Sequence, residues 1–324
     1  MTDKIELYEV VGCSPKKRRK EDGAVFPACK TYMYEETPSS HVQINPDGVL
    51  KLMHDVKVLS TIQTPYRGSF YLEELWKVNC VGINLIWIRG RDETLRLIDR
   101  NGSLLETVKT SYVVSAMTVN SNQEPVFLIG LSDRHVYIYR INKVEILLEL
   151  TDWLARDLHY TVNGDLLLSM HTKDGVQSKV VRYTGTKQIL EIQYDSTGQP
   201  LFGTKMGGML NLTENGNGDI CVAAFGCKSV TAVDTSGCLR FKFQGNCNHM
   251  KNTLFLPSNI ATDVNNQILI TDSSSNVVHI IDCDGNFVRY IEYPCNGGIS
   301  IDIDHNLVIG DRTTGEIRFI KYLE

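Results

Sequence analysis

The chain has 324 residues, 42% of them apolar, and its 33 basic and 38 acidic residues give a net charge of −5. This composition predicts a folded protein with a large core and disfavours a surface coated in nucleic acid. No apolar run approaches the roughly 18 residues of a membrane span, and the first 30 residues lack a secretory signal, so we expect a soluble cytoplasmic protein, with the nucleus as a second location.

Residues 1–40 do not follow the pattern of the rest of the chain and are predicted to form a disordered basic arm. A basic run follows the dipeptide Ser14-Pro15 and consists of Lys16, Lys17, Arg18, Arg19 and Lys20. Such a run resembles a nuclear-localisation signal, and Ser14-Pro15 resembles a phosphorylation site whose added charge would mask it. The alternative is a solvated tail with neither role.

Residues 41–324 are predicted to form one domain built from a repeat. The clearest copy, from Ser258 to Tyr293, holds four short runs of alternating apolar residues separated by Asn, Ser, Asp and Gly. Alternation indicates strands, and the residues between the runs form turns. One repeat upstream, Asp234 and Gly237 stand where this copy has Asp282 and Gly285, and Asp99 with Gly102 repeats the spacing again. Each copy is therefore predicted to be a four-stranded sheet whose last two strands are joined by an Asp-x-x-Gly turn.

Units of about 40 residues with four strands each are typical of a β-propeller. The complete blades are predicted at Val78–Thr110, Tyr112–Leu150, Trp153–Phe202, Gly208–Asn246 and Ser258–Tyr293. A sixth blade begins at Gly297 but lacks its fourth strand, and Val56–Thr64 is the predicted donor. Such closure would remove an exposed sheet edge. We therefore predict an all-β, six-bladed propeller closed by an N-terminal strand.

The segment SNIATDVNNQILITDSSSNVVHIIDCDG resembles an NHL repeat. The positions that carry the resemblance are Pro257, Asp263, Asp272, Asn276, Asp282 and Gly285, whereas Asn259 stands where Gly is usual. Residues 56–324 are similar to the C-terminal propellers of tripartite-motif proteins of the invertebrate type. The resemblance implies a non-catalytic module that recognises a protein or RNA on one face, as the target-recognition part of a ubiquitin-ligase system.

The zinc-binding RING that gives such systems their ligase activity is not predicted in this chain. Residues 1–55 hold only Cys13, Cys29, His41 and His54 as candidate zinc ligands, without the ordered spacing that a RING needs. We therefore expect no enzymatic activity of the chain itself. The sequence leaves open whether the chain is full-length, a truncated product or a paralogue without RING, B-box and coiled coil.

Cations recur in loops that a propeller places on one face. The predicted partner-binding face consists of Arg89, Arg91, Arg134, His135, Arg156, Lys173, Lys228, Lys251 and Arg312. A cationic rim in an acidic chain suits an anionic partner, and protein is favoured over RNA because few loop aromatics are available for base stacking. We expect a monomer with no cofactor, metal, membrane or small-molecule substrate.

A calcium-dependent propeller hydrolase, of the lactonase or esterase type, is the alternative. Asp263, Asp272, Asp302 and Asp311 supply the oxygen ligands that calcium requires. Because they recur at matching positions of the repeat, the competing interpretation is that they are structural residues that bond turns.

Overall fold

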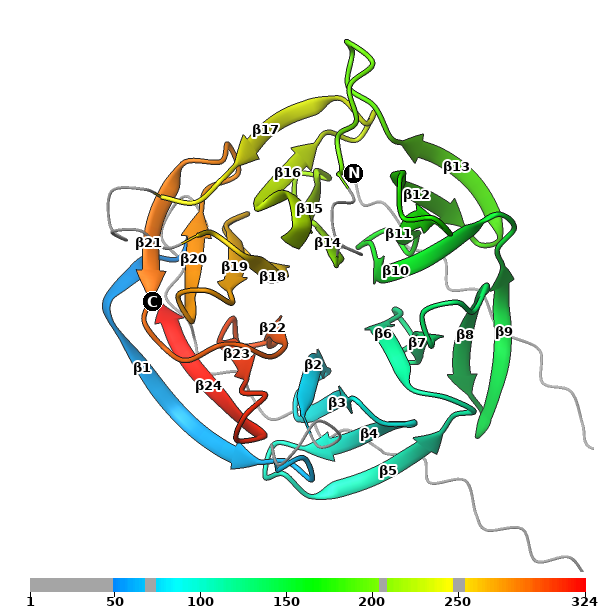
Figure 1. Cartoon of the computed structure of the whole chain (residues 1–324). Helices are drawn as coiled ribbons and strands as arrows, with labels where there is room; N and C mark the ends of the chain where they lie inside the picture. The colour runs from blue at the N-terminus through cyan, green and yellow to red at the C-terminus, as the bar shows by residue number, and fades with distance from the viewer. Residues whose placement is uncertain (1–48, 68–73, 204–208, 247–253) are drawn as a thin grey trace, which may run out of the picture. The chain divides into compact units, whose positions relative to one another are not determined.

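The structure is a computed structural model that describes residues 49–67, 74–203, 209–246 and 254–324. These residues form six four-stranded antiparallel sheets around a central axis (Figure 1). The predicted all-β, six-bladed propeller is confirmed. The helical content of the described ranges is one short 3-10 helix, η1 (Phe225–Cys227), and nothing in them has the length and apolarity of a membrane-spanning helix.

Each blade runs from an inner strand at the axis to an outer strand at the rim (Figure 1). The first two blades contain β2 (Leu75–Val81), β3 (Leu85–Gly90), β4 (Thr94–Asp99), β5 (Leu104–Lys109), β6 (Val114–Val119), β7 (Pro125–Ile129), β8 (His135–Arg140) and β9 (Lys143–Glu149). The next two contain β10 (Trp153–Tyr160), β11 (Leu166–Thr172), β12 (Ser178–Thr184), β13 (Lys187–Ile192), β14 (Leu210–Glu214), β15 (Ile220–Ala224), β16 (Ser229–Val233) and β17 (Leu239–Phe243). The last two contain β18 (Pro257–Thr262), β19 (Ile268–Asp272), β20 (Val277–Ile281), β21 (Phe287–Ile291), β22 (Ile299–Ile301), β23 (Leu307–Gly310) and β24 (Glu316–Leu323), with β1 (Leu52–Gln63) as the outermost strand.

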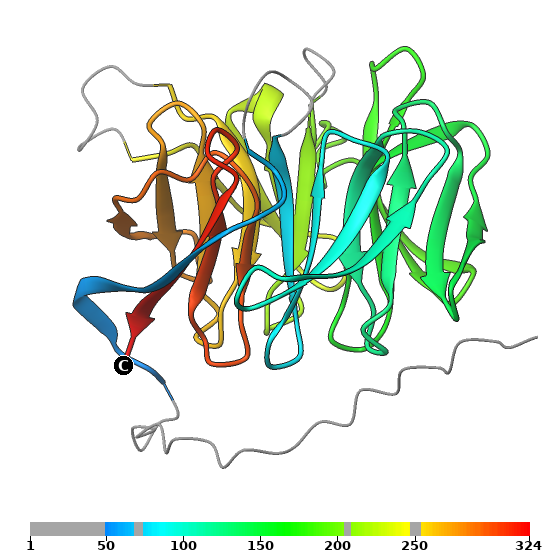
Figure 2. The same cartoon turned by 90° about the horizontal axis from the view of Figure 1, so that it is seen from below.

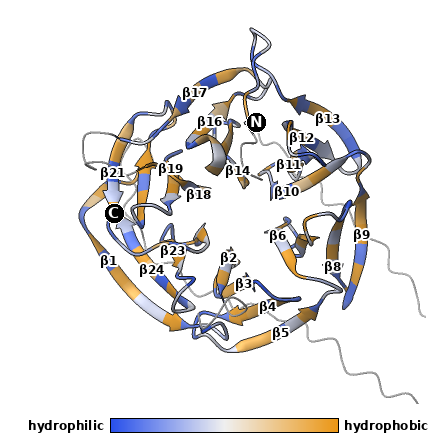
Figure 3. Cartoon of the chain, viewed as in Figure 1, coloured by the Kyte–Doolittle hydropathy of each residue, from blue (hydrophilic) through white to orange (hydrophobic). Residues whose placement is uncertain are grey.

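The core lies between neighbouring blades. Every residue of β7, β15 and β19 is buried, whereas the outer strands β5 and β13 are mostly exposed. The second strand of a blade is covered on both faces because each blade packs against two others. The sequences of these strands are therefore continuous apolar runs. Hydrophobic residues follow the strands around the whole ring (Figure 3), and the connecting loops emerge at the two faces of the disc (Figure 2).

The predicted Asp-x-x-Gly turns are present. The Oδ1 atom of Asp282 accepts hydrogen bonds from the N–H groups of Asp284 and Asn286, at 2.9 and 2.8 Å. Gly285 has a φ of +86° and donates its N–H to the carbonyl of Asp282 at 3.1 Å. Glycine is favoured there because a side chain rarely adopts a positive φ. The same turn at Asp99 ends in Gly102, also with a φ of +86°.

Strand β1 joins the two ends of the described propeller. It pairs antiparallel with β24, in a register that places Ile62 opposite Ile317. The predicted donor Val56–Thr64 overlaps this strand, although the strand begins earlier, at Leu52, and ends at Gln63. The outer edge of β24 is thereby paired, and the N-terminal segment supplies the fourth strand of the sixth sheet.

Candidate functional site

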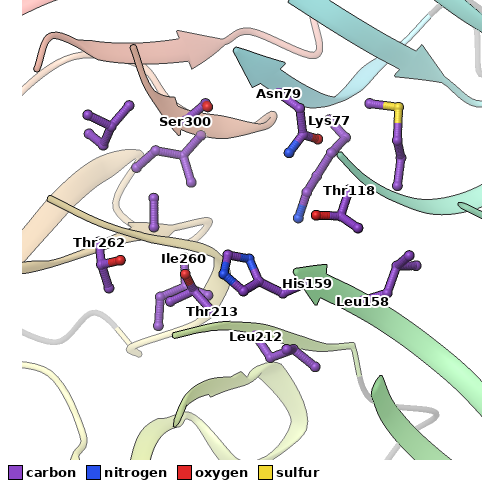
Figure 4. A pocket seen from close by; sticks show the side chains of 14 residues that line it. Lys77, Asn79, Thr118, Leu158, His159, Leu212, Thr213, Ile260, Thr262 and Ser300 are labelled. Carbon is purple, nitrogen blue, oxygen red and sulfur yellow. The ribbon is translucent and has the colours of Figure 1, made fainter. Parts of the chain in front are cut away.

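The six inner strands surround a cavity of about 170 Å³ at the centre of the propeller. Its fourteen lining residues all belong to β2, β6, β10, β14, β18 and β22, so every blade contributes to it (Figure 4). Most are apolar or carry a hydroxyl group. Lys77 from β2 and His159 from β10 are the two lining side chains that can titrate or carry charge, and both point into the same space (Figure 4).

Side chains of one inner strand bond the next inner strand along its open edge. The backbone N–H of Leu212 on β14 donates to Oδ2 of Asp157 at 3.1 Å, and the N–H of Cys80 on β2 donates to Oγ of Ser300 at 3.1 Å. Asp157 is only 2% exposed. These bonds satisfy backbone groups that would otherwise be unpaired at the axis, and they fix where the neighbouring side chains enter the cavity.

Lys77 is 8% exposed, and its Nζ lies 3.6 Å from Oδ2 of Asp157. That distance makes an ion pair, but it is too long for a good hydrogen bond. No hydrogen bond from Nζ to any described residue is present. An ammonium group carries three donors, so Lys77 retains donors for a bound molecule.

His159 is partly buried, and neither of its ring nitrogens has a hydrogen-bond partner among the described residues. Burial, together with the Lys77 ammonium, lowers the pKa of His159 to about 4. Its imidazole is therefore neutral at pH 7. A neutral imidazole accepts a proton on one nitrogen and donates from the other.

Further polar groups surround these two side chains. The Oδ1 atom of Asn79 is buried and has no hydrogen-bond partner within the described ranges. Thr118 and Thr213, which are 5% and 3% exposed, add hydroxyl groups to the lining. Several polar groups thus converge on one small cavity, and such convergence gives a small-molecule site its orientation and specificity.

The candidate calcium ligands do not form a metal site. Oδ1 of Asp263 accepts the N–H groups of Asn265 and Gln267, at 2.9 and 2.8 Å. Asp302, Asp272 and Asp311 likewise accept backbone N–H groups of their own turns. None of the four lines the cavity, and the described residues contain no group of three or more His, Cys, Asp or Glu that could hold a metal. Their role as turn-bonding residues, the competing interpretation of the sequence, is confirmed, and these four aspartates do not together form a calcium site.

The predicted partner-face cations fall into two groups. Arg91, Arg134, Lys173 and Lys228 are exposed in connections between second and third strands. Others already have protein partners: His135 pairs with Asp133 at 2.6 Å, and Arg312 pairs with Glu74 at 3.1 Å and stacks on Trp76. Lys251 and the basic run Lys16–Lys20 lie outside the described residues.

Arg89 and Arg156 of that predicted face lie within strands rather than in loops. Arg89 donates to the backbone carbonyl of Val114 at 3.2 Å, and burial lowers its pKa to about 10, against the opposing effect of Asp157. Arg156 lies within the inner strand β10, where burial lowers its pKa. Arg89 thus lies opposite Lys77 in the pairing of β2 with β3, although it does not line the cavity.

Comparison with known proteins identifies the architecture. No protein-family model and no curated protein sequence matches the chain. Virginiamycin B lyase from Staphylococcus aureus is similar with a TM-score of 0.58 and 12% identity, over 82% of this chain and 99% of that one. A catalytically inactive histidine-to-alanine variant of that lyase, with quinupristin, gives a TM-score of 0.53 at 13% identity, covering 75% and 80% of the two chains.

Two further solved propellers are similar. A gluconolactonase from Xanthomonas campestris gives a TM-score of 0.56 at 11% identity over 83% of this chain and 99% of that one. The calcium-binding protein regucalcin from Agrobacterium tumefaciens gives 0.58 at 12% identity over 78% and 92%. At such identities the likeness establishes the six-bladed fold, and none of these matches is specific to NHL repeats or tripartite-motif proteins.

These neighbours correct the functional prediction. The sequence analysis predicted a non-catalytic recognition module and no enzyme, but similar propellers include a lyase and a gluconolactonase. That prediction was wrong because it used the repeat and the rim loops, whereas the chemically distinctive residues lie at the axis. The signal was present in the sequence as Lys77 within WKVNC and His159 within LARDLHY, two basic residues inside strands. We conclude that the chain is a six-bladed β-propeller with a candidate active site in its central cavity.

Proposed function

We propose that this chain is an enzyme that acts on a small molecule in the central cavity by general acid–base chemistry. The observation that carries the proposal is the neutral imidazole of His159 in the same cavity as the Lys77 ammonium. At pH 7 the imidazole is in its unprotonated form, which can accept a proton, and the ammonium can stabilise negative charge on a nearby oxygen. Together they supply the two elements that enolate-forming reactions need.

The reaction that these two residues support best is elimination. His159 takes a proton from a carbon next to a carbonyl group, and the electrons of the broken C–H bond form a carbon–carbon double bond. The bond to a leaving group on the next carbon breaks, and the leaving group departs with that electron pair. The His159 imidazolium then returns the proton to the leaving group, while Lys77 stabilises the charge that develops on the carbonyl oxygen.

The lyase among the similar structures supports this assignment in one respect. Its variant with histidine replaced by alanine is catalytically inactive, so a propeller of this fold can depend on one histidine. Hydrolysis of an ester or lactone is the second candidate, suggested by the gluconolactonase. In that case His159 would take its proton from water, and the calcium ligands of the sequence-based alternative would have no part.

The blades themselves we infer to be NHL-like, since their Asp-bonded turns follow the repeat pattern that the sequence shows. This inference concerns only the scaffold. The proposed chemistry depends on the inner strands, where Lys77 and His159 depart from the repeat.

Incubation with a pooled set of small esters, lactones and β-substituted carbonyl compounds tests the proposal, with mass spectrometry of the products. We expect the wild-type chain to consume at least one compound class and His159→Gln to lose about two to four orders of magnitude of that rate, the usual contribution of a general base. Elimination yields two fragments with no added atoms, whereas hydrolysis adds the elements of water.

The matched control is His135→Gln, because His135 lies at the rim and pairs with Asp133. Its rate should equal that of the wild type. Equal consumption by His159→Gln and wild type would refute the role of His159.

A further inference from the structure

We infer that the molecule bound in the central cavity is a small carboxylate, held through its negative charge by Lys77 with support from Arg89. The inference deepens the proposed function and rests on it for the reaction, since the carboxylate becomes the group whose charge Lys77 stabilises. Binding itself needs no reaction and is testable separately.

Positive charge exceeds negative charge around Lys77. Lys77 and Arg89 are directly opposite one another in the pairing of β2 with β3, and residues so paired project from the same face of a sheet. Like charges in that arrangement are unfavourable. Asp157 is the carboxylate that acts on both of them, through the 3.6 Å ion pair with Lys77 and through its electrostatic effect on Arg89. Asp157 pairs with Lys77, and no ion pair of Arg89 is present within the described ranges, so the two cations exceed the carboxylate by one positive charge.

Asp157 is already engaged by the protein backbone. Its Oδ2 atom accepts the N–H of Leu212 at 3.1 Å, and this is also the oxygen closest to Lys77. Arg89 directs its Nη1 to backbone carbonyls, and its Nε is buried without a hydrogen-bond partner in the described ranges. Buried cations are costly unless paired and hydrogen-bonded. A ligand carboxylate in the cavity would give the Lys77 ammonium, which lines it, a second negative charge and hydrogen-bond acceptors.

The size and the lining of the cavity limit which molecules fit. A cavity of about 170 Å³ resembles in volume the engineered apolar cavities of about 150 Å³ that hold one benzene molecule. Apart from Lys77 and His159 its lining is uncharged, with apolar side chains such as Leu158, Leu212 and Ile260. The ligand that fits has one negative charge and an uncharged body no larger than about one aromatic ring.

His159 lines the same cavity as Lys77. A carboxylate held by Lys77 places its neighbouring carbon atoms within the space that His159 also faces (Figure 4). The substrate class that follows is a small carboxylic acid with an acidic C–H bond and a leaving group. A neutral ester or lactone would leave the positive charge excess without a partner.

Benzoate and its neutral analogue benzamide are probes of this charge requirement. The full chain, labelled with ¹³C-histidine, would be titrated with each at pH 7 by NMR and by calorimetry, and the His159 signal would be identified by its loss in His159→Gln. We expect benzoate to shift the His159 signal and to bind at least about tenfold more tightly than benzamide, as one charge-assisted hydrogen bond predicts. Equal affinities would overturn the inference on the wild-type protein alone.

Variants then locate the site. Lys77→Met should weaken benzoate binding at least about tenfold and leave benzamide binding nearly unchanged, whereas Lys77→Arg should retain most of the benzoate affinity. Lys179→Met is the matched control, because Lys179 is equally buried but pairs with Glu191 on an outer strand. Benzoate binding that survives Lys77→Met, or that Lys179→Met weakens equally, contradicts the inference.

These results are separable from the test of activity. Lys77-dependent binding of benzoate with no consumption of any compound would support the carboxylate site and refute the proposed enzyme. Consumption that depends on His159, combined with equal binding of benzoate and benzamide, would support the enzyme and refute the carboxylate site.

Discussion

Lys77 and Lys179 are buried to the same extent, each 8% exposed, but in different regions of the propeller. Lys179 lies on β12, 2.8 Å from Glu191 and 4.3 Å above the ring of Trp153. Lys77 lies at the axis, with its nearest carboxylate at 3.6 Å and no hydrogen bond from its Nζ to a described residue. The protein supplies partners for the charge of Lys179, which lies on the third strand of its blade, a region called the wall below. The charge of Lys77, at the axis, is only partly compensated. The two lysines are equally buried, but their partners differ. Lys179 therefore has a structural role, and we assign Lys77 a ligand-binding role.

The same contrast applies to the acidic partners. Glu191 is 40% exposed in its side chain, so water can replace Lys179 as its partner. Asp157 is 2% exposed and acts on two buried cations. Removal of each carboxylate therefore tests the comparison most strongly.

Asp157→Ala is expected to have the largest effect. It leaves Lys77 and Arg89 without a counter-charge and deprives the Leu212 N–H of its acceptor. Loss of one partner of a buried ion pair costs about 3–5 kcal/mol. Urea denaturation should show a loss of that order in the free energy of unfolding, whereas Glu191→Ala should cost no more than about 1 kcal/mol. Similar losses in the two variants would contradict the distinction between wall and axis.

His159 provides the second test, through the pH dependence of stability. Its pKa in the fold is about 4, below the ordinary value of 6.5, because burial and Lys77 disfavour the protonated ring. Between pH 6.5 and 4 the unfolded chain therefore binds a proton at this position that the folded chain does not. This histidine lowers the stability as the pH falls through that window, by up to roughly 3 kcal/mol, and has little effect above it.

His159→Gln should remove that contribution. Its free energy of unfolding, measured by urea denaturation at several pH values, should fall less steeply between pH 6.5 and 4 than that of the wild type. Parallel curves for the two proteins would show that His159 titrates in the fold as it does in the unfolded chain.

The sequence predicted the scaffold well because the scaffold is periodic. Alternation of apolar residues and the spacing of Asp282 and Gly285 report local chemistry that every blade repeats. The closing strand was also predictable, since a propeller with an incomplete last blade needs a partner for β24. The strands and turns were predictable from residues that are close together in the chain, and the closing strand was predictable from the number of strands in each blade.

The candidate site was not predictable in the same way because it is formed once, by residues from different blades. Lys77 and Asp157 come from the first and third blades, and only closure of the ring places them 3.6 Å apart. Arg89 was singled out as a rim cation, since sequence position does not reveal that its guanidinium is buried against β6. Polar residues within the inner strands are the signal that a sequence-based reading could have used.

The smallest expected effect is that of Lys179→Met at the wall. Methionine keeps most of the apolar contact with Trp153, while the change removes a cation–π contact and an ion pair with the half-exposed Glu191. Such interactions contribute about 0.5–1 kcal/mol each at partly exposed sites, and the lost cost of burying the ammonium offsets part of that loss. Urea denaturation should therefore detect a loss of no more than about 1 kcal/mol, and the NMR signal of His159 should keep its chemical shift. A larger loss, or a displaced His159 signal, would mean that the wall and the axis are coupled through blade three, and Lys179 could then no longer serve as the structural counterpart of Lys77.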